Sequence, residues 1–338
     1  METKRINFVV ILLVCFVSCK DQPLSYLVQG EEEAIVGEVW KKADGVSLYT
    51  DLKITDSYYV FLDYRSDSIL QVYTKDDPLK PVVYGIKDEK EKRFSSVEFT
   101  KSNTRYTSGN EDVWIVDDKK MLTQIRCRKD SLEVVQDIPL PENLGRSIEY
   151  NIGKEEIYGI LSSGKKGNAY YLFRPDSGYY WVSAYKGPKI YRKNDFAFSA
   201  NLIVNEKANS TVCAYRFFNK VQFFDLKDNI VRDVMYGDER IEPKDIVVST
   251  FNFTENRKCF IDICGTDQYV YCVYDGSYDY SQLSKIMIFK WDGTHIKTLQ
   301  TDRKIKKIAI EKSDSYLMAI AADEHGGRDV VRYSLKGL

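Results

Sequence analysis

Two cysteines near the start of the chain are suited to chemistry: Cys15, which follows the bulky Val14 inside a short apolar segment, and Cys19 at the end of that segment. Lys4 and Arg5 precede the apolar run 8–17, and the small residue Ser18 comes directly before Cys19. Ten helical residues rise about 15 Å, half of the roughly 30 Å hydrocarbon core of a bilayer, so a stable membrane span is disfavoured. A positively charged N-terminal region, a short apolar stretch and a small residue before the cleavage site are typical of a cleaved secretion signal.

The stretch "LLVCFVSCK" resembles a bacterial lipobox, in which the cysteine thiol is acylated and the cysteine becomes the new N-terminus. The resemblance implies a signal peptide over 1–18 and a lipid anchor on Cys19, with Phe16 as a departure where such boxes usually carry Leu. Several acyl chains hold a protein on a bilayer far better than one. It also implies an outer-membrane location in a bacterial envelope, with the leaflet left open. An ordinary signal with an incidental cysteine is the alternative. Residues 19–33 are polar and aperiodic beyond the cysteine, which predicts a tether.

A second group suited to chemistry is the loop "YDGSYDYSQLSK" at 274–285. It gathers Asp275, Tyr278, Asp279 and Tyr280 within a few residues. Tyr and Asp on a long exposed loop suit adaptable recognition of a sugar, a peptide or a protein. We therefore predict ligand binding by these four residues, with a long but idle loop as the alternative.

Motifs of the common catalytic and cofactor sites are absent from the sequence. There is no Gly-rich phosphate loop, no G-x-S-x-G elbow, no H-E-x-x-H motif and no EF-hand loop. The two histidines, His295 and His325, argue against His-based catalysis, and the cysteine spacings match no zinc pattern. We therefore predict no metal, no cofactor and no catalytic residue. Carboxylates alone could still serve a glycosidase or a lyase, which keeps an enzyme open as an alternative.

Composition and cysteine count narrow the class further. The formal net charge of −1 offers no general attraction for nucleic acid. Three cysteines lie in "CFIDICGTDQYVYC", which indicates strand, turn and strand. If residues 266–267 form a two-residue turn, Cys264 faces Tyr269 and Cys259 faces Tyr274, so no two thiols are opposite. We expect these cysteines to be small buried hydrophobic residues rather than disulfides.

One structural unit recurs along the chain: an apolar strand, a tight polar turn and a second apolar strand. Copies lie at 70–85, 123–138, 170–185, 221–237 and 286–299. One or two further strands precede each hairpin, and no stretch of useful length has a helical period. Four short strands about every 50 residues are typical of propeller blades. The strands are apolar on both faces, as expected for a sheet packed between two others, whereas a β-sandwich would alternate more cleanly.

The sixth unit is incomplete, because it supplies three strands before the chain stops at Leu338. A three-stranded blade would leave an open edge. The strand-like stretch "AIVGEVWKK" at 34–42 has no other partner, so we assign it as the outer strand of the last blade. The sequence therefore predicts an all-β, six-bladed β-propeller over 34–338, closed by an N-terminal strand.

Three stretches carry a family resemblance: "NKVQFFDLKDNIVRDV", "FIDICGTDQYVYCVYDG" and "IMIFKWDGTHIKTLQTDRKIKKIAI". They are similar to the TolB-like six-bladed β-propeller lipoproteins, anchored bacterial proteins mostly without an assigned activity. The resemblance covers the chain from about residue 34 to its end. It departs at "YGIKDEKEKRFSSVEF", where such proteins often carry a Gly- and Pro-rich turn and this chain carries charges.

These observations support two hypotheses of function. The preferred one is a lipid-anchored envelope module that binds or scaffolds a protein, peptide or glycan partner. The alternative is a propeller hydrolase or lyase that acts on glycans or peptides through carboxylates in the central funnel. We expect the functional face to carry the charged turn 86–93, the basic stretch 186–193 and the loop 274–285.

Overall fold

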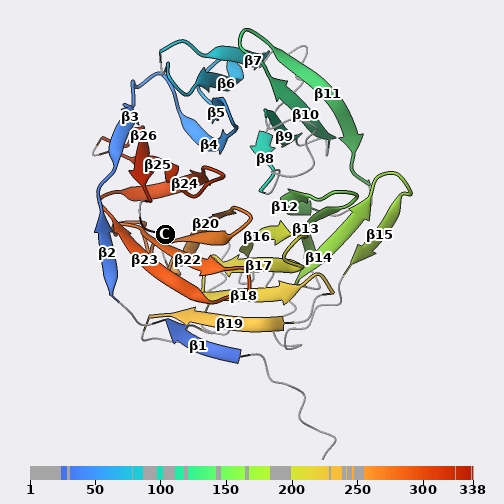
Figure 1. Cartoon of the computed structure of the whole chain (residues 1–338), viewed down its shortest axis with the longest axis vertical. Helices are drawn as coiled ribbons and strands as arrows, with labels where there is room; N and C mark the ends of the chain where they lie inside the picture. Colours follow the sequence, from blue (N-terminus) through green and yellow to red (C-terminus); the bar gives the residue numbers. More distant parts are fainter. Residues whose placement is uncertain are drawn as a thin grey trace, which may run out of the picture.

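The computed structural model is an all-β ring of six sheets (Figure 1). The structure describes residues 24–28, 31–77, 79–86, 97–101, 111–117, 121–141, 146–163, 167–182, 199–227, 230–237, 241, 246, 255–323, 325–335 and 337. Each sheet is a propeller blade whose first strand is innermost in the ring. The predicted fold class is therefore confirmed.

The first three blades are four-stranded antiparallel sheets in simple chain order. Blade one contains β4 (Tyr49–Ile54), β5 (Tyr58–Asp63), β6 (Ser68–Thr74) and β7 (Val82–Ile86). Blade two contains β8 (Val97–Phe99), β9 (Asp112–Asp117), β10 (Met121–Cys127) and β11 (Leu132–Pro139). Blade three contains β12 (Arg146–Ile152), β13 (Ile157–Ser163), β14 (Gly167–Arg174) and β15 (Tyr179–Val182).

The last three blades each recruit one strand from the start of the chain. Blade four contains β16 (Ala200–Asn205), β17 (Ser210–Tyr215), β18 (Lys220–Asp225) and β19 (Ile230–Tyr236), with β1 (Leu24–Val28) outside them. Blade five contains β20 (Phe260–Gly265), β21 (Tyr269–Tyr274), β22 (Lys285–Lys290) and β23 (His295–Thr301), with β2 (Glu32–Ile35) outside them. Blade six contains β24 (Lys304–Ile310), β25 (Tyr316–Ala322) and β26 (Arg328–Ser334), with β3 (Glu38–Lys41) as its fourth strand.

The N-terminal strand closes the ring as the sequence predicts, but only residues 38–41 of the predicted stretch 34–42 form it, because residues 34 and 35 belong to β2 on blade five. β3 pairs antiparallel with β26, with Val39 opposite Val331 and Glu38 opposite Arg332. Trp40 then stacks on Phe61 of blade one, with ring centroids 5.9 Å apart. Blade six therefore has four strands, and its outer strand also contacts the blade that follows it in the ring.

The stretch expected to be a tether differs from that expectation, because it contains β1 and β2. β1 pairs in parallel with β19, and β2 pairs in parallel with β23. Each added strand thereby covers the outer edge of its blade, where N–H and C=O groups would otherwise have no strand to pair with. Glu32 and Glu33 also bind cations on blade five: Glu32 lies 2.6 Å from Lys285 and Glu33 lies 2.8 Å from Lys297. Two of the three glutamates that make this stretch look solvated are therefore paired with the propeller.

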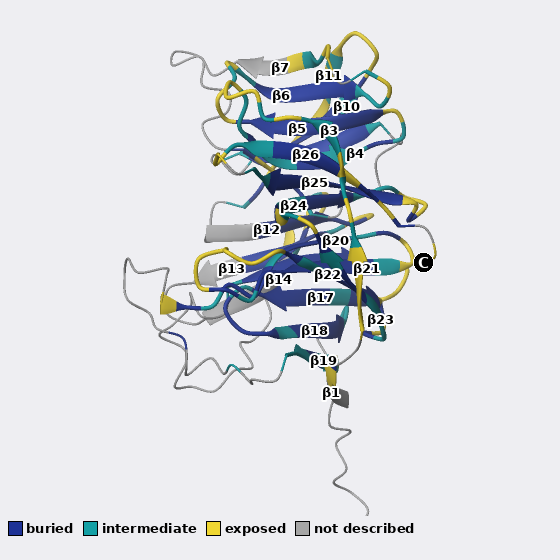
Figure 2. Ribbon diagram, turned by 90° about the vertical axis from the view of Figure 1, so that its left-hand side faces the viewer, coloured by how far each residue is buried: buried dark blue, intermediate teal, exposed yellow. Residues whose placement is uncertain are grey.

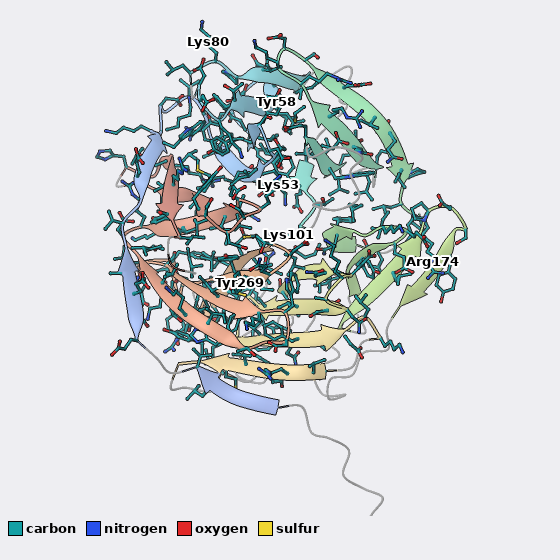
Figure 3. The ribbon with its side chains drawn as sticks, in the orientation of Figure 1. Lys53, Tyr58, Lys80, Lys101, Arg174 and Tyr269 are labelled. Carbon is teal, nitrogen blue, oxygen red and sulfur yellow. The ribbon has the colours of Figure 1, made fainter. Side chains whose placement is uncertain are left out.

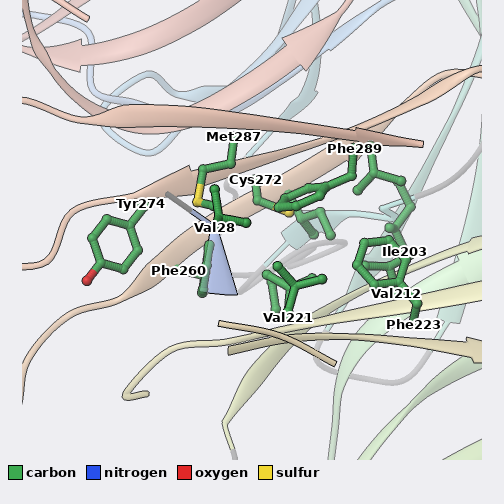
Figure 4. Close-up of a cluster of buried hydrophobic side chains, with 14 of the residues drawn as sticks. Val28, Ile203, Val212, Val221, Phe223, Phe260, Cys272, Tyr274, Met287 and Phe289 are labelled. Carbon is green, nitrogen blue, oxygen red and sulfur yellow. The ribbon is translucent and has the colours of Figure 1, made fainter. Parts of the chain in front are cut away.

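One hydrophobic core fills each interface between blades, which explains why the strands are apolar on both faces. Figure 2 shows the buried residues concentrated in the strands and the exposed ones in the turns. Between blades four and five, Val212 and Phe223 pack with Phe260 and Phe289, and Val28 of β1 joins them (Figure 4). The ring is thus held together blade against blade.

The register of the hairpin that carries three cysteines differs from the predicted one. Cys264 is opposite Tyr271, because the turn residues are 267–268 and the backbone N–H of Thr266 donates to the carbonyl of Tyr269 at 2.9 Å. Five cysteines are buried, as expected for small hydrophobic residues: Cys127, Cys213, Cys259, Cys264 and Cys272. Within the residues that the structure describes there is no α-helix, and so none that could cross a membrane.

Candidate functional site

β-Bulges in the innermost strands direct charged side chains toward the axis of the ring. β4, β12, β20 and β24 each shift register directly before a charged residue. A bulge adds one residue to a strand and re-aims the side chains around it. The four charged residues line cavities around the axis, and they are Asp51, Glu149, Asp262 and Lys307.

An ion pair crosses the ring at its centre. Lys101 follows the first strand of blade two and binds the carboxylate of Asp262 in blade five, and these blades are opposite in a ring of six. Figure 3 shows Lys101 near the centre. Asp262 is 1% exposed, lies 3.5 Å from Lys307 and accepts the backbone N–H of Ile308 at 2.9 Å. Burial opposes its charge, but the two lysines and these hydrogen bonds prevail and lower the pKa of Asp262 to about 2.

A second lysine supports the crossing pair from blade one. The ammonium of Lys53 donates to the backbone carbonyl of Lys101 at 3.1 Å. Burial lowers the pKa of Lys53 to about 8, although Asp51 partly offsets that effect. Burial also opposes the charge on Lys101, yet the attraction of Asp262, Glu149 and Asp51 outweighs it and raises the pKa of Lys101. Lys101 is therefore held as a cation, whereas Lys53 titrates nearer to neutral pH.

A polar chain links blades three, four and five beside this pair. Arg216 contacts Glu149 at 2.9 Å and donates to the side-chain oxygen of Asn201 at 2.9 Å. Asn201 in turn donates to the backbone carbonyl of Phe260 at 3.0 Å. Burial raises the pKa of Glu149 although Lys101 and Arg216 favour its ionised form. The Nε atom of Arg216 is buried and has no hydrogen-bond partner.

Above the crossing pair lies a cavity of about 380 Å³, called here the upper cavity. Lys101 also lines a smaller cavity of about 40 Å³ beneath it, so its ion pair with Asp262 lies at the boundary between the two. The lining of the upper cavity includes residues before or early in first strands, such as Ser199 and Thr50, and residues near or after the ends of second strands, such as Leu62 and Arg216, so the cavity extends toward the face of the ring where first strands begin and second strands end. Its lining residues are Thr50, Asp51, Leu62, Tyr64, Val97, Glu98, Phe99, Lys101, Glu149, Tyr150, Ser199, Arg216 and Lys307.

The loop 275–284, which joins β21 to β22, lies on the same face as the upper cavity. Asp275 is 2% exposed and accepts the backbone N–H of Ser277 at 2.8 Å. The hydroxyl of Ser277 then accepts the backbone N–H of Ser281 at 2.9 Å. Gly276, whose φ of 88° suits glycine, donates to the carbonyl of Lys258 at 2.7 Å. The loop is therefore internally hydrogen-bonded, and Asp275 organises it rather than reaching the surface.

Two tyrosines project from this loop over cations. Tyr278 is 50% exposed and Tyr280 is 38% exposed. The guanidinium of Arg257 lies 5.7 Å from the ring centroid of Tyr278, and the ammonium of Lys306 lies 4.3 Å from that of Tyr280. Tyr280 also has a φ of 59°, an outlier for a bulky residue of the kind that clusters at functional sites. Burial raises the pKa of Tyr280, and the charge of Arg216, which lines the upper cavity, opposes that rise, so Tyr280 lies near the cavity.

The structure thus brings part of the predicted site together. Tyr278, Asp279 and Tyr280 are exposed on one loop, whereas Asp275 is buried. The basic stretch 186–193 and nearly all of the charged turn 86–93 lie outside the described residues, as does Cys19.

Sequence reasoning missed the charged centre of the ring. A signal for it exists, because four first strands carry a charge within an otherwise mixed or apolar stretch: "YTDLKI", "RSIEYNI", "FIDICG" and "KIKKIAI". Aligning the blades by their first strands would have placed these charges at one level. Lys101 and Arg216 lie outside the strands and give no such signal.

No protein-family model matches this chain, and no curated protein matches it. Among the described residues, no three His, Cys, Asp or Glu side chains gather as a metal ion would require.

Proposed function

We propose that this protein is a lipid-anchored binding module of the bacterial cell envelope, similar to the TolB-like six-bladed propeller lipoproteins. Its partner is a protein, peptide or glycan that contacts the face carrying the upper cavity and the loop 275–284. The observation that carries the proposal is a pair of exposed tyrosines, each placed over a cation, on the face of the ring that also has a charged cavity of about 380 Å³. Exposed aromatic residues on a rigid scaffold are suited to recognition.

The state of the central carboxylates favours binding over hydrolysis. A glycosidase of the carboxylate type uses two acidic side chains that flank the scissile bond. Here Asp262 is bound by Lys101, and Glu149 is 4% exposed and bound by Arg216. The lining also includes lysine, tyrosine and serine side chains, which can form hydrogen bonds with a ligand.

The proposed anchor also sets how the propeller stands on the membrane. Four residues lie between Cys19 and the start of β1 at Leu24, and the five residue-to-residue steps span at most about 18 Å. An acylated Cys19 would therefore hold the outer edge of blade four near the bilayer and leave both faces of the ring accessible. Cys19→Ala is expected to release the protein from membranes, and Cys15→Ala to leave it bound; membrane retention of the Cys19 variant contradicts the anchor.

The loop is tested by the double variant Tyr278→Ala with Tyr280→Ala. We expect it to weaken capture of the envelope partner while the melting temperature stays within about two degrees, because exposed substitutions usually cost under ~0.5 kcal/mol. Tyr179→Ala is the matched control: Tyr179 is 49% exposed and lies 5.5 Å from Arg174, but it begins the fourth strand of blade three, on the opposite face. Normal capture by the double variant together with loss of capture by Tyr179→Ala would place the binding face on the other side.

A further inference from the structure

Two acidic side chains in the upper cavity form no salt bridge within the described residues, although Asp51 attracts Lys53 and Lys101 from a distance. Asp51 accepts one hydrogen bond, from the backbone N–H of its neighbour Leu52 at 2.9 Å, and has no ion pair there. Glu98 lines the same cavity from blade two and is exposed. Blades one and two thus present negative charge that the described part of the protein leaves open to a ligand.

Two cations on other blades are also incompletely paired. The Nε of Arg216 is buried without a hydrogen-bond partner, and a buried donor in that state costs free energy until something binds it. Lys307 lies 3.5 Å from Asp262, a carboxylate that Lys101 already binds more closely. Arg216 follows the second strand of blade four, which is opposite blade one, so its charge faces Asp51 across the cavity.

This arrangement selects against ligands that carry one sign of charge. An anion that binds Arg216 would meet Asp51 and Glu98, and a cation that binds those carboxylates would meet Arg216 and Lys307. A ligand with separated charges of both signs satisfies both sides, because a site gains specificity from repulsion as well as attraction. Leu62 of blade one and Val97 and Phe99 of blade two supply apolar surface beside Asp51 and Glu98.

We propose that the upper cavity binds a small zwitterion, an amino acid or short peptide with free termini; this inference rests on the proposed binding function and names its ligand. The ammonium group faces Asp51 and Glu98, and the carboxylate faces Arg216 and Lys307. The volume of about 380 Å³ is at the low end of the range for small-molecule sites, which fits a ligand of this size.

The test is isothermal titration of the full mature chain in detergent at pH 7. The probes are trialanine, N-acetyl-trialanine, trialanine amide, maltotriose and succinate. We expect trialanine to bind at least tenfold more tightly than either blocked peptide, because each block removes one charge. Blocked peptides that bind as well as trialanine, tighter binding of maltotriose or succinate, or no binding by any probe at millimolar concentration would each overturn the inference.

Variants that each remove one charge test which side chains bind the ammonium group of the peptide and which bind its carboxylate. Asp51→Asn keeps the acceptor for Leu52 and should abolish the preference over N-acetyl-trialanine, whereas Lys307→Gln should abolish the preference over trialanine amide. Glu98→Gln, on an exposed side chain, replaces Asp51→Asn if that variant fails to fold. Asp267→Asn is the control, since its exposed carboxylate pairs with Lys207 in the turn after the first strand of blade five. Unchanged preferences in all the cavity variants would contradict the assignment.

The outcomes distinguish a wrong ligand assignment from a wrong proposed function. Absence of trialanine binding with intact dependence of partner capture on Tyr278 and Tyr280 overturns the ligand alone. Selective trialanine binding without that dependence overturns the role of the loop and keeps the cavity.

Discussion

At the residue scale, the centre of this propeller contains buried charged side chains that are paired with side chains of opposite charge. Lys101 and Asp262 come from opposite blades and are both largely buried, with side-chain exposures of 11% and 2%. A buried pair is weak evidence of net stabilisation, but breaking it by removing one partner is costly. The pair therefore constrains the ring, because either charge alone would be stranded near the axis.

Asp262→Asn tests that balance. The variant keeps an acceptor for the backbone N–H of Ile308 but leaves Lys101 as a buried cation without its carboxylate, so we expect a loss of about 3–5 kcal/mol in unfolding free energy. The double variant Lys101→Met with Asp262→Leu should lose less, because it removes both charges. Urea denaturation measures all three proteins. A single variant within ~0.5 kcal/mol of the parent would show that the crossing pair does not hold the ring.

At the element scale, hairpins were easier to predict than registers. The five hairpins found by pattern are the third and fourth strands of blades one to five, because tight polar turns and apolar runs are local signals. The register of β20 with β21 was missed because a side chain–backbone turn at Thr266 and a bulge before Asp262 both shift it. β1 and β2 were missed because each adds a fifth strand to a blade that already has four, so no incomplete repeat indicated them, whereas the three-stranded last unit indicated β3.

The segment that joins β2 to β3 passes close to blade six at Gly37. A Cβ added to Gly37 would lie 2.2 Å from Cγ1 of Val331 and 2.7 Å from the ring of Tyr333, so the chain can pass blade six here only as glycine. Gly37→Ala should push β3 away from β26 and cost about 1–3 kcal/mol. Hydrogen exchange of the β26 amides and urea denaturation measure the effect. Val36→Ala, at an 81% exposed position, should change stability by under ~0.5 kcal/mol. Equal behaviour of the two variants would contradict this close approach.

At the scale of the whole molecule, the sequence predicted the ring and its closure but not its charged centre. Blade count, strand order and the role of β3 follow from a repeat and from an incomplete last unit. The upper cavity depends on which charges the bulges bring to one level and on contacts across the ring, such as Lys101 with Asp262. Such contacts join distant parts of the chain, and no local pattern encodes them.

The central claim is that a partner binds the face with the upper cavity and the loop 275–284. Photo-cross-linking from two single sites in the native envelope tests it most directly, with p-benzoylphenylalanine placed at Tyr278 or at Tyr179. The two side chains are equally exposed, at 50% and 49%, and each lies beside an arginine, but they are on opposite faces. We predict a defined cross-linked partner from position 278 and none from position 179. A partner captured from position 179, or from neither position, would contradict the account.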